Sequence, residues 1–104
     1  MRLMTDRYHR QIRFTDEREQ HMVTTHPEMV DQIAQIEETL VMPEAVVQSN
    51  SAVDVEMFYR YYQLTPVNAK YLCVVVKLLP SDGFIITAYF TDKIKKGTIL
   101  WLKS

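Results

Sequence analysis

Residues 70–91, KYLCVVVKLLPSDGFIITAYFT, hold two mainly hydrophobic runs separated by a short polar stretch. The two runs are rich in Val, Ile, Phe and Tyr, which suit the pleated, half-buried surface of a sheet. Between them, residues 80–83 read PSDG, a sequence that favours turns. The pattern therefore predicts a β-hairpin, around which we expect the rest of the chain to be arranged.

The length of the loop decides which side chains of this hairpin share a face. A loop of three or five residues places Leu78 opposite Phe84 and makes one face wholly apolar. That face carries Leu72, Val74, Val76, Leu78, Phe84, Ile86, Ala88 and Phe90. The opposite face carries Tyr71, Cys73, Val75, Lys77, Ile85, Thr87, Tyr89 and Thr91. A loop of two or four residues would bring Lys77 onto the Phe84 face, so we favour the first pairing because it buries no charge.

Two helices are predicted before the hairpin. In FTDEREQHM, Thr15 or Asp16 can cap a first helix with an acidic first turn, and this helix should end near Thr25 because Pro27 follows. A second helix is expected to start at Pro27 and to stop at Pro43. Its apolar residues recur at helical spacing and form a stripe that the apolar hairpin face can cover.

The remaining segments complete an α+β fold. Residues 45–48 and 55–64 (VEMFYRYYQL) read as strands, and residues 98–102 form an apolar terminal segment with Trp101. We therefore expect a single domain, 1–104, in which two N-terminal helices pack on a four-stranded antiparallel sheet in two layers. Residues 1–13 are expected to be an arm with a short strand near residues 11–14, residues 15–42 the helical layer, and residues 44–102 the sheet.

Composition places the chain among ordinary globular proteins, with 47% hydrophobic and 24% charged residues. The charged N-terminus has no apolar run and no stretch suits a membrane span, so we expect a cytoplasmic protein without a membrane partner. Cys73, the one cysteine, cannot form an intramolecular disulfide, and packing in a strand is a simpler role for it than reactivity.

Charge divides the chain into an acidic and a basic half, although the net charge is only -1. Residues 28–56 hold seven acidic residues and no Lys or Arg, whereas residues 57–104 hold seven basic residues and two acidic ones. A basic sheet half can bind phosphate, because remote charges are screened beyond about 8 Å. Lysines that keep sheet edges from aggregating would explain the same residues.

Two histidines are the first candidates for chemistry, since only His titrates near neutral pH without perturbation. His21 and His26 lie at the end of the first helix and in the break before Pro27, so both can approach the sheet. His26 as a cap and His21 as a packing residue are the structural alternatives.

The polar face of the sheet supplies the other candidates. It is expected to present Arg60, Tyr62, Lys77, Thr87, Tyr89 and Thr91. Cations, hydroxyls and aromatic rings recognise phosphates and unstacked bases, and metal-independent RNA cleavage needs a base, an acid and a cation. Alternating Tyr and Thr residues are equally typical of any sheet. With only two glycines, one cysteine and no HExxH spacing, no phosphate loop, metal site or cofactor is predicted.

Several short runs, in their order, resemble one family. They are RFTDEREQHMVTTHPEM, IEETL followed by a proline, an aromatic strand with Arg, KYLCVVVK and FIITAYFTDKIKKGTILW, and together they cover about residues 13–101. This order is similar to that of small phage and bacterial proteins of the barnase, EndoU, colicin and RelE-like nuclease superfamily. The resemblance implies helices on a four-stranded antiparallel sheet and a metal-independent ribonuclease or toxin that leaves a 2′,3′-cyclic phosphate.

The resemblance also implies roles for individual residues. His21, His26, Pro27 and Glu28 would form the histidine segment, Lys77 the cation, and Thr87 or Thr91 the hydroxyl. Thr25 stands where an Arg would be expected, so a relative that has lost catalysis is a second form of this hypothesis. RNA, and a protein inhibitor, are the partners implied.

A non-enzymatic interaction module is the alternative hypothesis. It would use the sheet edge and its tyrosines to bind another protein or a second copy of the chain.

Overall fold

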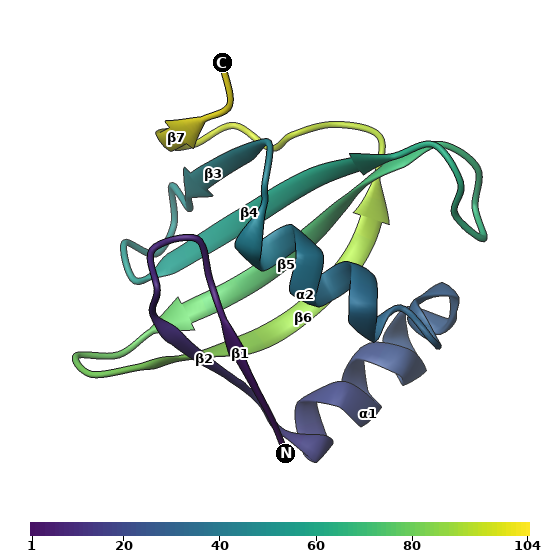
Figure 1. Ribbon diagram of the computed structural model, residues 1–104, viewed down its shortest axis with the longest axis horizontal. Helices are drawn as coiled ribbons and strands as arrows, with labels where there is room; N and C mark the ends of the chain where they lie inside the picture. Colours follow the sequence, from purple (N-terminus) through teal and green to yellow (C-terminus); the bar gives the residue numbers. More distant parts are fainter.

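The computed structural model describes residues 1–104 and has an α+β fold in which two helices pack on one mixed seven-stranded sheet (Figure 1). The strands are β1 (Arg2–Thr5), β2 (Gln11–Phe14), β3 (Ala45–Gln48), β4 (Val55–Tyr62), β5 (Lys70–Leu78), β6 (Gly83–Thr91) and β7 (Thr98–Leu102). The helices are α1 (Asp16–Thr25), the short 3-10 helix η1 (Pro27–Met29) and α2 (Ile33–Val41). The strand order is β1-β2-β6-β5-β4-β3-β7.

The expected four-stranded antiparallel sheet is wrong in size and in one pairing. The segment expected to be an arm forms the antiparallel hairpin β1–β2, and β2 pairs in parallel with the start of β6, Ile12 opposite Gly83. At the other edge β7 pairs with β3. The four strands that the sequence predicted form the centre of a larger sheet, which is curled enough for its ends to approach each other (Figure 1).

The β5–β6 hairpin combines the two pairings that the sequence left open. Leu78 lies opposite Gly83 across a four-residue loop, so Lys77 lies opposite Phe84 as in the disfavoured pairing. The register then shifts between Val75 and Val76, and Val74 lies opposite Ala88 as in the favoured one. This irregularity absorbs one residue, so that Ile85 enters the core in place of Ile86. No charge is buried by either half of the hairpin, because the face that Lys77 shares is the one without helices.

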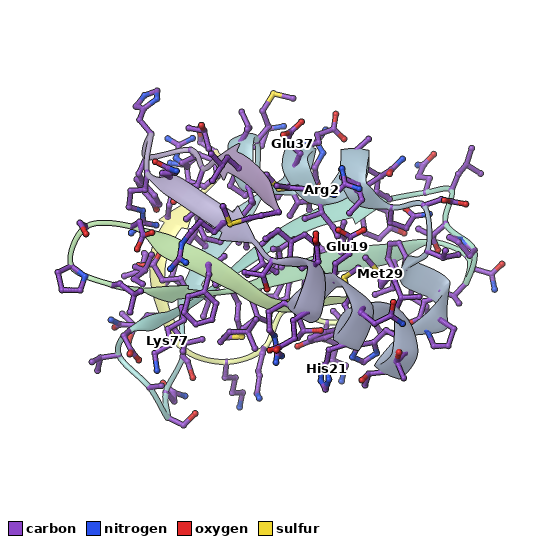
Figure 2. The ribbon with its side chains drawn as sticks, turned by 90° about the horizontal axis from the view of Figure 1, so that it is seen from below. Arg2, Glu19, His21, Met29, Glu37 and Lys77 are labelled. Atoms are coloured by element: carbon purple, nitrogen blue, oxygen red, sulfur yellow. The ribbon has the colours of Figure 1, made fainter.

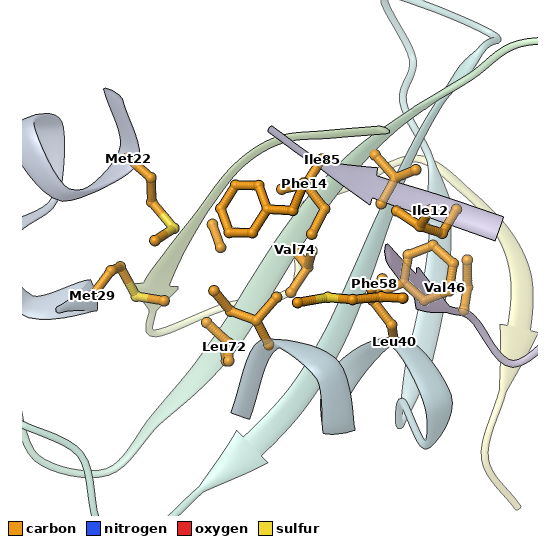
Figure 3. Packing of buried hydrophobic residues seen from close by; sticks show 14 residues of the cluster. Ile12, Phe14, Met22, Met29, Leu40, Val46, Phe58, Leu72, Val74 and Ile85 are labelled. Atoms are coloured by element: carbon orange, nitrogen blue, oxygen red, sulfur yellow. The ribbon is translucent and has the colours of Figure 1, made fainter. Parts of the chain in front are cut away.

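Both helices pack on the same face of the sheet, which we call the helix face. Met22 of α1, Met29 of η1, and Ile36 and Leu40 of α2 are fully buried there. They meet strand residues Met4, Ile12, Phe14, Val46, Phe58, Leu72, Val74, Val76, Ile85 and Ala88 (Figure 3). No helix of the chain combines the length and apolar character needed to cross a membrane.

The opposite side of the sheet, which we call the outer face, carries no helix. A second cluster of Ala45, Val47, Met57, Tyr59 and Cys73 is buried on it. Residues 92–97, which we call the crossing segment, connect β6 to β7 over this face, since β7 lies beyond β5, β4 and β3. Ile94 packs on the cluster, and the N–H of Lys95 donates to the Tyr59 hydroxyl at 3.1 Å.

Candidate functional site

His26 lies where α1 ends at the border of the outer face. Thr15 caps the start of α1 by accepting a hydrogen bond from the Arg18 N–H, and the Arg18 Nε donates to the Ile86 carbonyl at 2.9 Å. The helix is thereby fixed beside β6. It stops at His26, whose N–H still donates to the Met22 carbonyl, because Pro27 begins η1.

The His26 side chain contacts β6 through an aromatic neighbour. Its ring lies 5.4 Å from the Tyr89 ring between centroids, with the two planes 33° apart. Its Nδ1 is 3.7 Å from a carboxylate oxygen of Glu28, and about a third of the side chain is exposed. The arrangement therefore offers solvent an imidazole that is oriented by a ring on one side and a carboxylate on another.

His21 is exposed on α1, and no hydrogen bond or ion pair holds its side chain. In Figure 2 it points away from Glu37 of α2, toward the side of the molecule where Lys77 also lies. The two labelled side chains are nevertheless well apart along the sheet (Figure 2). His21 lies in the middle of α1, five residues before His26, and no contact joins the two side chains; Lys77 lies elsewhere on the sheet (Figure 2).

The register of β5 explains why Lys77 is remote. Tyr89 lies opposite Cys73, and Lys77 is four residues further along β5, about 13 Å away at 3.3 Å per residue. Lys77 also lies 3.6 Å from Asp54. The structure therefore does not bring Lys77 to the His26–Tyr89 contact.

Thr87 and Thr91 lie on the outer face, two residues before and two residues after Tyr89 on the same strand. The Thr87 hydroxyl is buried and has no hydrogen-bond partner. The Thr91 hydroxyl makes a long contact of 3.4 Å with the Lys93 carbonyl. Both threonines therefore lie on the face predicted for them and next to Tyr89 on that face.

Arg60 and Tyr62 lie on the helix face, opposite to their expected location. On β4, Phe58 enters the core beneath the helices, whereas Met57 faces the other way. Arg60 and Tyr62 lie on the same face of β4 as Phe58. Arg60 donates to the Met42 carbonyl at 2.7 Å, and the Tyr62 hydroxyl donates to Glu38 at 2.6 Å. Burial and this hydrogen bond raise the pKa of Tyr62 to about 12. These two side chains therefore bind the end of α2 and the residue that follows it through hydrogen bonds, on the face of the sheet away from His26.

Lys95 is a cation on the outer face, over the strand pair next to Tyr89, that the sequence interpretation did not name as a candidate. The Lys95 N–H donates to the Tyr59 hydroxyl. Tyr59 of β4 lies opposite Cys73 of β5, and Cys73 lies opposite Tyr89 of β6, so Lys95 lies two strands from Tyr89. Burial raises the pKa of the Cys73 thiol to about 11, and the charge of Lys95 opposes part of that rise. None of Lys93, Lys95 and Lys96 forms an ion pair. Only the crossing of residues 92–97 over the outer face places these lysines here, and that path has no signal in the local sequence.

Tyr61 and Tyr71 were not named as candidates, although the sequence placed Tyr71 on this face. They lie opposite each other on the outer face, beside Thr91. Tyr61 belongs to the set of β4 residues that alternates with Arg60 and Tyr62, so a correct choice of face would have identified it.

No three His, Cys, Asp or Glu side chains lie close enough together to hold a metal ion. Comparisons with protein-family models, curated proteins and solved structures found no match.

Proposed function

We propose that the chain is a metal-independent RNA endonuclease domain of the small, toxin-like kind, with its site around His26 on the outer face. The observation that supports this most directly is the seating of His26 on Tyr89 with Glu28 at 3.7 Å. An imidazole is the side chain that general acid–base catalysis uses most often, and it needs no metal for that role. Lysines of the crossing segment add positive charge to the same face.

The proposed reaction is an internal transfer within RNA. The 2′-hydroxyl oxygen attacks the adjacent phosphorus while His26 accepts its proton, and the bond from phosphorus to the 5′-oxygen breaks. His21 donates a proton to that 5′-oxygen, which leaves as a hydroxyl, and the other fragment keeps a 2′,3′-cyclic phosphate. Lys95 stabilises the charge on the phosphate oxygens. Thr91 positions the phosphate, since the Thr87 hydroxyl is buried. Lys77, Arg60 and Tyr62 have no part in this revised site.

The test is cleavage of total RNA in EDTA, followed by mapping of the new ends. We expect cyclic phosphate ends from the unmodified protein, their loss in His26→Ala, and a decrease of at least tenfold in Lys95→Ala. Lys77→Ala is the matched control, since it removes a half-exposed lysine from the same face and should leave cleavage unchanged. Thermal unfolding of each variant separates loss of chemistry from loss of fold. RNA that stays intact at high protein concentration would overturn the proposal for such substrates.

A protein-interaction module is the second candidate, and one observation favours it. Strand β7 is a free edge of the sheet, and its residues Ile99 and Leu102 are 62% and 60% exposed. Exposed apolar edges are ready to pair with another strand, and a second copy could add its own β7 there.

Light scattering after size exclusion tests this candidate. The dimer mass should appear at micromolar concentration and be lost in Ile99→Lys. Leu64→Lys changes an apolar residue that is 94% exposed outside β7 and should leave the dimer intact. A monomer at every concentration would refute self-pairing.

A further inference from the structure

Tyr61 and Tyr71 form an aromatic pair on the outer face. Tyr61 of β4 lies opposite Tyr71 of β5, and their ring centroids are 5.2 Å apart with the planes at 72°. Tyr71 also contacts the buried Tyr59, at 6.4 Å and 89°. The three rings form a continuous edge-to-face series from the core to the surface.

This pair is accessible, unlike its buried neighbour. Tyr61 is 42% exposed and Tyr71 is half-buried, whereas Tyr59 is only 1% exposed. The Tyr59 hydroxyl bonds to the Met57 sulfur and the Lys95 N–H, but neither the Tyr61 nor the Tyr71 hydroxyl has a hydrogen-bond partner. The outer two rings are therefore held by packing at one side and face solvent at the other.

The pair lies beside the His26 site at a useful separation. Tyr71 is two residues from Cys73 along β5, about 7 Å, and Cys73 lies opposite the Tyr89 on which His26 rests. Tyr89 lies one strand further across, about 5 Å, and the His26 ring lies 5.4 Å from the Tyr89 ring, so Tyr71 and His26 are separated by the length of one to two extended nucleotides. A phosphate at His26 would thus place the base of a neighbouring nucleotide over Tyr61 or Tyr71.

Positive charge accompanies the aromatic pair. The crossing segment carries three exposed lysines, and its neighbour Asp92 is ion-paired with Lys70. Aromatic rings beside a line of cations are the combination that binds single-stranded nucleic acid, since bases stack on the rings and phosphates lie along the charges. A base inside a duplex is already stacked on its neighbours and cannot use such a ring.

We infer that Tyr61 and Tyr71 are a base-stacking platform, and that the substrate class of the proposed nuclease is single-stranded RNA. The inference rests on the proposed function for its location, but it concerns binding and can be tested without cleavage. A 2′-O-methyl RNA of 12 nucleotides lacks the attacking hydroxyl, so its affinity for the unmodified protein can be measured by fluorescence anisotropy in EDTA.

Substitutions at Tyr71 separate stacking from packing. Tyr71→Leu keeps an apolar side chain for the contact with Tyr59 but has no π face, and we expect it to weaken binding about 5- to 100-fold. Tyr71→Phe keeps the ring and should bind like the unmodified protein. Tyr8→Leu is the control, since it removes a ring that is 39% exposed outside the outer face, and it should leave binding unchanged. Equal melting temperatures would show that each variant is folded.

A duplex of the same sequence completes the experiment. We expect it to bind at least tenfold more weakly than the single strand. Tyr71→Leu binding as tightly as the unmodified protein, or a duplex binding equally well, would overturn the platform. Binding that depends on Tyr71 without any cleavage of natural RNA would overturn the nuclease and keep the platform. Cleavage of natural RNA with no effect of the Tyr71→Leu substitution would overturn the platform and keep the nuclease.

Discussion

Cys73 makes stability depend on alkaline pH. Burial raises the pKa of its thiol from the ordinary 9.0 to about 11. The unfolded chain therefore releases this proton from about pH 9, while the folded chain holds it, so the free energy of unfolding falls as the pH rises between these values. We expect a loss of about half a kcal/mol between pH 7.5 and about pH 9.3, measured by urea unfolding.

The control for this prediction is Cys73→Ala. It removes the titrating thiol, so its loss over the same interval should be smaller than that of the unmodified protein by about half a kcal/mol. Stopping near pH 9.3 keeps most of the tyrosine ionisation, with an ordinary pKa of 10.0, out of the measurement. The same loss in Cys73→Ala would assign the effect to another group.

Arg10 joins two buried carboxylates. Its guanidinium lies 2.7 Å from Asp6 and 2.7 Å from Glu56, which are 2% and 7% exposed. Arg10→Met would leave both charges buried without their cation, and we expect it to lower the free energy of unfolding by about 3 kcal/mol. Urea unfolding at pH 7 measures this loss.

Arg13 is the matched control for Arg10. Its side chain is equally exposed, 33% against 32%, but it pairs with Asp82, which is itself partly exposed. Arg13→Met should therefore cost less than about 1 kcal/mol. Similar losses in the two variants would mean that burial of the carboxylates does not decide the energy.

At the scale of the elements, the sequence predicted those helices and strands whose bounds are set by neighbouring residues. The caps and prolines placed α1 and the stop of α2, and two β-forming runs around a turn placed the β5–β6 hairpin. The expected start of the second helix at Pro27 is wrong, because only the short η1 forms there and α2 begins at Ile33, after Asp31 with its positive φ. The irregularity at Val75/Val76 was not predictable, because a four-residue loop fits the pairing of residues near the turn while an odd-numbered loop fits the pairing further from it. The parallel pairing of β2 with β6 was missed for a related reason: it joins segments about 70 residues apart and leaves no periodic signal.

Candidate residues could be named from the sequence where a single element determines their position. His26 became a candidate because a helix end before a proline has a direct sequence signal, and Tyr89 because it lies on the polar face of a predicted strand; only the structure shows that their rings are in contact. Arg60 and Tyr62 were placed on the wrong face, because both faces of β4 carry large apolar residues and alternation alone cannot choose between them. Lys95 required knowledge of the path of the crossing segment over the sheet.

Gly97 tests that path. A Cβ at this position would lie 2.3 Å from the Gln48 carbonyl oxygen and 2.6 Å from a Val47 methyl group. Gly97→Ala should therefore displace the crossing segment and lower the free energy of unfolding by about 2 kcal/mol. Gly83→Ala is the control, because its Cβ would meet no atom closer than 3.1 Å, and it should cost less. Equal stability of Gly97→Ala and the unmodified protein would contradict this packing.

At the scale of the whole molecule, the two ends of the curled sheet meet. Arg7, in the turn between β1 and β2, donates its N–H to the Leu40 carbonyl at 2.8 Å. Its guanidinium lies 3.6 Å from the ring centroid of Trp101 in β7. Because β1 and β7 are the outermost strands, this contact encloses α2 between the ends of the sheet. The hairpin expected to be an arm is therefore part of the closure of the fold.

Trp101 is the one tryptophan of the chain, so its fluorescence reports this closure directly. Arg7→Ala removes the guanidinium from the indole but keeps the backbone hydrogen bond to Leu40. We expect emission at longer wavelength, greater quenching by acrylamide and a loss of about 1 kcal/mol, the usual size of a cation–π contact. Lys103→Ala is the control, since it removes an exposed neighbouring cation that does not contact the ring. If Arg7→Ala leaves the emission and quenching unchanged, the ends of the sheet are held together by the Leu40 hydrogen bond and the core without the stacked side chain.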